Sequence, residues 1–224
     1  MNIIVLFMVS VMAIFVWWML LQRITAKPWL EQGVAFDPRV AGGNGYSPYV
    51  AGKLALWVFM VVISSLFMLF ITAYHMRMEL NDWRHLHLPG SLWFNTALLV
   101  VASIALQTAR QGLERGNAGR VRAGYLAGGL FAMAFIAAQL WTWQQLVAAG
   151  HPVASNPAAS FFYLLTGLHG VHLLGGLLVW GWGAARLLSG ASLARLRLTI
   201  ESCTVYWHYL LLLWLGLFAL LQHG

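Results

Sequence analysis

Long apolar runs separated by short polar segments are the dominant pattern of this sequence. Six of these runs are long enough to cross a membrane as a helix, since a span needs about 20 predominantly apolar residues. They cover Asn2–Leu21, Tyr49–Tyr74, Leu92–Ala109, Ala123–Val147, Ala159–Ala185 and Ile200–Leu221. The segments between them hold nearly all the proline, arginine and lysine. The pattern predicts an all-α integral membrane protein, a helical bundle with about six transmembrane helices.

The composition supports lipid as the natural solvent of this chain. Hydrophobic residues make up 61% of it and charged residues only 8%, whereas a soluble domain carries about 25% charged residues. The net charge of +7 comes from lysine and arginine in the segments between runs, where they set membrane orientation rather than form a nucleic-acid-binding face. The single cysteine, Cys203, excludes a disulfide framework and a cysteine-rich metal site.

The basic residues also predict how the helices are oriented. The first, third and fifth segments between runs, with their edges, carry eleven lysine and arginine residues, and the second and fourth carry only Arg77 and Arg84. Basic loops stay in the cytoplasm, so both termini are expected on the outer side. The first run has no basic residue before it and is followed by Arg23 and Lys27, which favours a retained helix over a signal peptide.

The chain is expected to have three parts. An N-terminal transmembrane helix covers 1–22, a cytoplasmic connector covers 23–48, and a five-helix bundle covers 49–224. The connector is rich in glycine and proline and reads as irregular. Glycine is also frequent in the fifth run, so that helix is expected to pack most tightly against its neighbours.

A few polar side chains lie inside the predicted spans, where an ionisable group needs a partner or a function. His169 and His172 lie three residues apart on one face of the fifth helix, and His208 lies in the sixth, with Glu201 near its cytoplasmic end. The uncharged polar residues in other spans are Asn95, Gln107 and Gln139. A metal or haem site, for example a haem between His172 and His208, is one interpretation of the histidines. Hydrogen bonds between helices or to lipid headgroups are the interpretation we favour.

The polar inventory excludes several classes of membrane protein. An oxidase catalytic core would need more deep histidines than the three found here, and a proton-driven transporter would show several buried carboxylates, where Glu201 is the only candidate. No phosphate-binding glycine loop or nucleophile motif is found in the sequence. The residues alone therefore predict an accessory membrane subunit without catalytic or metal-ligating residues, with a small transporter or a haem-b membrane protein as rivals.

Two stretches are more specific. Ser160–Leu173 reads SFFYLLTGLHGVHL, and the last span contains a glutamate followed by Tyr-Trp-His. Both resemble motifs of subunit III of haem–copper terminal oxidases, the cytochrome c oxidase subunit III family. The matching residues are Thr166, Gly167, His169, Gly170 and His172 in the fifth run, and Glu201, Tyr206, Trp207 and His208 in the sixth. Weaker matches extend the resemblance over about 49–221.

The resemblance implies a bundle docked on oxidase subunit I, next to subunit II and a small subunit IV, in a bacterial inner membrane. A family member carries no haem or copper of its own, holds phospholipids in a V-shaped cleft, supports proton uptake into subunit I and protects the oxidase during turnover. The lipid-phosphate arginine of the family falls on Arg186. The resemblance implies structural or lipid-site roles for six more polar or aromatic residues: His169, His172, Glu201, Tyr206, Trp207 and His208.

The chain also departs from the family pattern. Ile63 and Leu211 stand where family members have a glutamate and an aspartate, so any role of those carboxylates is absent or rerouted. One helix, rather than two or none, precedes the five-helix unit. Glu201 is expected to pair with a nearby arginine or with His208, two turns away. The alternatives to an oxygen reductase subunit are an accessory protein of a nitric oxide reductase and an independent transporter.

Overall fold

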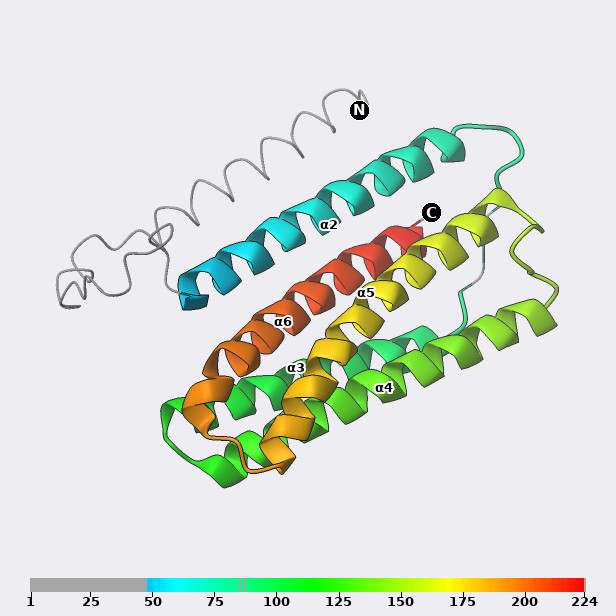
Figure 1. Ribbon diagram of the computed structural model, residues 1–224. Coiled ribbons are helices and arrows are strands. Elements are labelled where there is room, and N and C mark those ends of the chain that lie inside the picture. The colour runs from blue at the N-terminus through cyan, green and yellow to red at the C-terminus, as the bar shows by residue number, and fades with distance from the viewer. Residues whose placement is uncertain (1–47, 85, 87, 224) are drawn as a thin grey trace. The chain divides into compact units, whose positions relative to one another are not determined.

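The computed structural model describes residues 48–84, 86 and 88–223, and all regular structure within them is helical (Figure 1). The helices are α2 (Pro48–Met78), α3 (Ser91–Glu114), α4 (Ala118–Ala148), α5 (Pro157–Leu188) and α6 (Leu193–His223). Each of the five is long and apolar enough to cross a membrane, so the all-α class and the last five predicted spans are confirmed. The helix expected at 1–22 and the connector at 23–47 lie outside the described residues.

The helices run further than the apolar runs that predicted them. The fifth run was expected to end at Ala185, but α5 has 32 residues and continues to Leu188. At 1.5 Å per residue such a helix is about 48 Å long, which exceeds the hydrocarbon core and reaches through the headgroup region. The first turns of α6 likewise precede the apolar run and carry Arg195 and Arg197. Helix ends in the headgroup layer need no apolar residues, so hydropathy underestimates their length.

The chain divides into two units, residues 1–76 and 77–224. In the described part of the first, α2 satisfies its polar side chains internally. Ser64, Thr72 and His75 each bond to the backbone carbonyl four residues earlier, at 2.8, 2.9 and 2.8 Å. This is the usual way for short polar side chains to avoid an unpaired group in lipid.

Short, well-defined turns connect the four helices of the second unit. Helices α3, α4 and α5 each end at a glycine with positive φ: Gly116 (66°), Gly150 (85°) and Gly190 (79°). The residue after each glycine donates its backbone N–H to the carbonyl five residues earlier, as His151 does to Leu146 at 3.0 Å. This is the Schellman motif, in which the left-handed residue is usually glycine. The tight stops set α3 to α6 as antiparallel neighbours.

Helices α3 and α4 approach each other most closely, through small residues. A Cβ at Gly124 would come within 2.7 Å of the Ala105 carbonyl oxygen, and one at Gly128 would come within 2.5 Å of the Leu106 side chain. With little hydrophobic force between helices in lipid, such backbone contact provides the packing energy. Alanine at either position would force α3 and α4 apart.

A reciprocal contact joins α4 and α5. The Trp180 indole lies on Gly129, and its Nε1 donates to the Tyr125 carbonyl at 2.7 Å. The Tyr125 hydroxyl in turn donates to the Trp180 carbonyl at 3.3 Å, in the space left by Gly183. Each helix thus supplies one aromatic side chain and one glycine, and the pair fixes the register between the two helices.

Candidate functional site

A layer of uncharged polar side chains lies between α3 and α4, near the end of the bundle where α3 begins. Asn95, fully buried, donates from Nδ2 to Gln139 Oε1 at 2.8 Å and to Thr142 Oγ1 at 3.2 Å. Ser91 is bonded to Thr142 at 3.0 Å and donates to Gln145 at 3.1 Å. The sequence singled out Asn95 and Gln139 as polar residues in spans, and the structure brings these two together.

His169 lies in the interior of the bundle with no exposed surface. Its ring is 5.2 Å from the Trp214 ring and 5.9 Å from the Phe135 ring, centroid to centroid. Trp214 donates from Nε1 to Thr96 Oγ1 on α3 at 2.9 Å. Neither ring nitrogen of His169 has a hydrogen-bond partner among the described residues. His169 therefore lies at a junction of all four helices.

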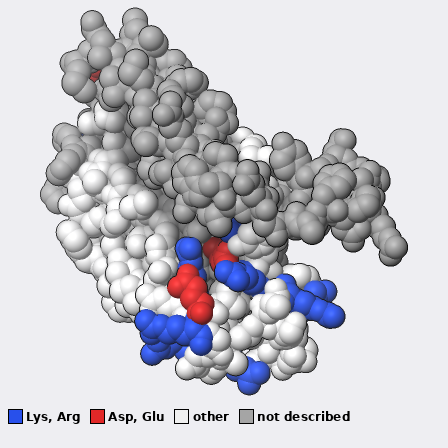
Figure 2. Space-filling view, turned by 90° about the vertical axis from the view of Figure 1, so that its left-hand side faces the viewer, with Lys and Arg blue, Asp and Glu red and all other residues white. Residues whose placement is uncertain are grey.

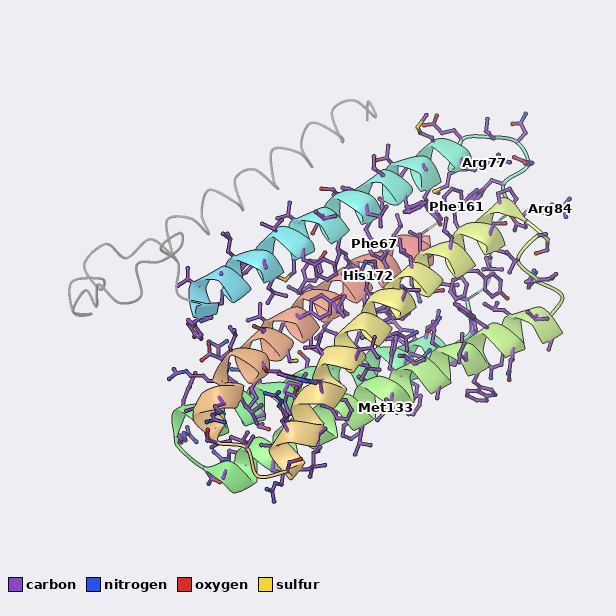
Figure 3. The ribbon with its side chains drawn as sticks, viewed as in Figure 1. Phe67, Arg77, Arg84, Met133, Phe161 and His172 are labelled. Atoms are coloured by element: carbon purple, nitrogen blue, oxygen red, sulfur yellow. The ribbon has the colours of Figure 1, made fainter. Side chains whose placement is uncertain are left out.

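The other two predicted histidines bond to their own helices. The Nδ1 atom of His172 is 2.7 Å from the Leu168 carbonyl oxygen, and that of His208 is 2.7 Å from the Thr204 carbonyl oxygen. Because a carbonyl only accepts, Nδ1 carries the proton in both rings. His172 projects from α5 (Figure 3), and its own carbonyl accepts the Tyr206 hydroxyl of α6 at 3.1 Å.

Tyr206 and Trp207 pack against α5 where a glycine makes room for them. A Cβ at Gly176 would come within 2.9 Å of both aromatic rings. Trp207 is fully buried, and its indole N–H finds no acceptor among the residues that the structure describes. The two aromatic residues thus contribute packing between α5 and α6 as well as one bond to the backbone of α5.

Glu201 and Arg186 lie near the other end of the bundle. Glu201, buried on α6, accepts a hydrogen bond from Arg197 Nε at 2.8 Å, one turn earlier. The pairing with a nearby arginine is therefore observed. Arg186, in the last turn of α5, is exposed, and its guanidinium stacks 4.1 Å from the ring centroid of Trp182. A cation at a helix C-terminus is favourably placed against the helix dipole.

Charge is distributed unequally between the two ends of the second unit. Figure 2 looks onto the end that holds the α3–α4 and α5–α6 turns, where basic side chains gather around acidic ones. The charged residues of these turns and the adjoining helix ends are Arg110, Glu114, Arg115, Arg120, Arg122, Arg186, Arg195, Arg197 and Glu201. By the positive-inside rule, a basic end of this kind is expected to face the cytoplasm.

The opposite end is electrically balanced. Arg77 and Arg84 lie there (Figure 3), accompanied by Glu79 and Asp82. Arg77 and Asp82 form a bidentate ion pair. The guanidinium holds the pKa of Asp82 below its ordinary value. The two ends thus differ in net charge, and the orientation of α3 to α6 in the membrane stays a prediction.

Several residues that organise the interior were not predicted. Phe135, Trp180 and Tyr125 belong to apolar runs and carry no local signal that separates them from lipid-facing aromatic residues. Their roles depend on which glycine of a neighbouring helix each one meets, and that depends on helix register. Among the described residues, no three His, Cys, Asp or Glu side chains gather closely enough to share a metal ion.

Comparison with known proteins gives one consistent family. The family model for cytochrome c oxidase subunit III matches residues 2–223. A cytochrome c oxidase subunit 3 from Corynebacterium diphtheriae is 26% identical over 193 residues, which cover 84% of this chain and 94% of the relative. A probable cytochrome c oxidase subunit 3 from Nocardia farcinica is 31% identical over 124 residues, 55% of this chain and 61% of the relative.

A fungal relative, the cytochrome c oxidase subunit 3 of Mycosarcoma maydis, is 32% identical over 127 residues, 55% of this chain and 44% of the relative. The match to the Nocardia protein spans about three fifths of that protein's length. The family match, in contrast, covers nearly the whole chain, including all the described helices. This multi-pass helical membrane protein therefore belongs to the cytochrome c oxidase subunit III family.

Proposed function

We propose that this chain is a non-catalytic subunit III of a bacterial haem–copper oxygen reductase. In this role it lies in the inner membrane with both termini on the periplasmic side, next to subunits I and II and a small subunit IV, which carry or support the redox chemistry. It stabilises subunit I, holds phospholipid and supports proton uptake. The observation that carries the proposal is the family match over residues 2–223.

The outer faces of the bundle support a role in docking. Large apolar side chains cover the outside of α4 and α5, with Trp141 at 55%, Leu130 at 60% and Leu178 at 78% exposure. In a membrane such faces meet lipid tails or the helices of a partner subunit. Several polar side chains of the interior bond from one helix to another, as Asn95 does to Gln139 and Trp214 does to Thr96. The bundle thus offers apolar surfaces to its surroundings, as an accessory subunit requires.

The lipid role is assigned to Arg186. Its guanidinium is exposed at the basic end of α5 and is held over Trp182. A planar guanidinium can bond a lipid phosphate with two parallel N–H groups, which an ammonium cannot do. Arg186→Gln should therefore lower the phospholipid retained by the purified complex, and Arg186→Lys should restore it only in part.

Native mass spectrometry of the complex measures this retention. Arg195→Gln is the matched control, because it removes one exposed arginine from the same end of the bundle. Equal lipid retention in the Arg186→Gln and Arg195→Gln complexes would show that Arg186 does not form a specific lipid site. Only the general attraction of basic residues to anionic lipid would then remain.

The proposal also predicts what the oxidase does without this chain. A complex purified from a strain that lacks the chain should keep its haem spectrum and its initial rate of O₂ reduction. It should lose activity faster during continuous turnover and take up protons more slowly. A complex without any haem spectrum would show that the chain supplies something essential to the redox centres. Unchanged durability and proton uptake would contradict the supporting role.

A further inference from the structure

Besides Trp207, three buried side chains of the bundle have polar atoms without a partner among the described residues. These atoms are Asn95 Oδ1, Gln139 Nε2 and both ring nitrogens of His169, none of which has a hydrogen-bond partner among the described residues. The exposed fractions are 0% for Asn95, 5% for Gln139 and 0% for His169. An unpaired buried polar group costs free energy, and in a bilayer no bulk solvent is near to satisfy it. Such a group therefore requires an explanation.

These side chains belong to one cluster. Asn95 is joined directly to Gln139 by the 2.8 Å bond. Gln139 lies one turn along α4 from Phe135, whose ring meets that of His169. On the other side of His169, Trp214 donates to the residue that follows Asn95 on α3. The contacts thus close a circuit through α3, α4, α5 and α6 at one level of the bundle.

The unpaired atoms form a balanced set of donors and acceptors. Gln139 Nε2 offers an N–H group and Asn95 Oδ1 accepts, while a neutral imidazole adds one donor and one acceptor. Exchanging oxygen and nitrogen in the side-chain amides of Asn95 and Gln139 would reverse the hydrogen bond between them. One donor and one acceptor would still remain without a partner. A water molecule has two donors and two acceptors, and buried waters typically make about three bonds to such groups. Water therefore fits the cluster better than an ion, which would offer only one kind of partner.

We propose that Asn95, Gln139 and His169 form an internal water-binding site that links α5 to the α3–α4 pair. The bound water bonds to the two amides and to one ring nitrogen of the imidazole. It differs from the lipid role assigned to Arg186, because it lies inside the bundle and involves uncharged groups. The inference depends on the four-helix bundle alone and holds whichever partners accompany the chain.

The sign of one substitution distinguishes a hydrated cluster from a dry one. If the cluster is dry, His169→Phe removes two unpaired polar atoms and should leave stability unchanged or raise it. If water bridges the cluster, the same change takes away the bond between the water and the imidazole and weakens the hold of the water on the two amides. The thermal midpoint for release of the chain from its complex should then fall by about 2–6 °C.

Two variants sharpen this test. His208→Phe is the matched control, because that half-buried ring already bonds to the Thr204 carbonyl and lies outside the cluster. Gln139→Leu combined with His169→Phe removes polar groups from both sides of the water, so the loss should be smaller than the sum of the two single losses. Additive losses, or a midpoint that His169→Phe leaves unchanged or raises, would overturn the proposal.

A density map of the wild-type complex tests the site directly, even if the variants fail to assemble. The complex is purified in native lipid with the partners that accompany this chain. At a resolution that shows ordered waters on its surface, the map should contain a non-protein peak within about 3.2 Å of at least two of the unpaired atoms. A map that shows the surface waters but no peak in the cluster would overturn the proposal.

Discussion

The contact between Trp180 and Gly129 gives the sharpest test of how the bundle is held together. In Gly129→Ala the new Cβ would lie well inside 3.0 Å of three atoms of the Trp180 indole, whereas ordinary contact begins at 3.4 Å. Because these atoms belong to a rigid ring, the indole must shift by about 1 Å or more. That movement also breaks the 2.7 Å bond from Trp180 Nε1 to the Tyr125 carbonyl.

The expected cost combines two effects. Forcing an extra methyl group into a packed interior costs about 1–3 kcal/mol, and the lost buried hydrogen bond adds about 1 kcal/mol. Gly129→Ala should therefore destabilise the bundle by about 2–4 kcal/mol, against the stabilisation that alanine usually gives a helix. Gly175→Ala on α5 is the matched control, because a Cβ there meets nothing within 4 Å.

The assay is the thermal release of this chain from the purified complex, with the fraction of chain retained after purification as a second measure. Gly129→Ala should lower both, and Gly175→Ala should leave both unchanged or slightly raised. Adding Trp180→Leu to Gly129→Ala should recover part of the loss, since the smaller side chain removes the clash. Equal midpoints for the two alanine variants, or no recovery in the double variant, would refute the packing argument.

Three smaller effects follow from other contacts. Trp214→Phe should destabilise the bundle by about 1–2 kcal/mol, because the buried hydrogen bond from the Trp214 indole to Thr96 on α3 is lost. Trp141→Phe, at an exposed position, is the control in the same thermal assay. Glu201→Gln should weaken the ion pair with Arg197 by up to about 1 kcal/mol. The purified complex should then contain less of this chain or less lipid, and an unchanged complex would contradict the prediction. Asp82→Asn should speed amide exchange of residues 79–84 at neutral pH, because it removes the ion pair with Arg77. The pKa of Asp82 is lowered, so the pair stabilises the turn above about pH 4 and is lost as the pH falls. A difference in exchange between wild type and variant that persists below the pKa of Asp82 would contradict this.

The fold was largely predictable because lipid imposes a strong constraint on sequence. Five of the predicted spans are helices within the described residues, since each apolar run is too long for any soluble element and must satisfy its backbone internally. The helix ends were less predictable. The Schellman glycines at 116, 150 and 190 lie beyond the apolar runs, where hydropathy no longer reports on structure.

The interior was predictable only in its composition. The polar residues Asn95, Gln139 and His169 stand out in apolar runs, so the sequence identifies them without showing which ones meet. Trp180 cannot be recognised in this way, because its place depends on a glycine 51 residues earlier on a neighbouring helix. The roles that the family resemblance gives to Arg186 and the three histidines stay predictions until lipid and partner subunits are observed with the chain.

The most direct test of the central claim is purification of a tagged form of this chain from native membranes in mild detergent. The material is then examined by mass spectrometry, by a reduced-minus-oxidised spectrum and by its consumption of O₂. A subunit of a haem–copper oxygen reductase should bring with it a large histidine-rich subunit, haem bands and O₂ reduction. Recovery of the chain without haem proteins would contradict the proposed function, and a partner that reduces nitric oxide instead of O₂ would assign the chain to a different reductase.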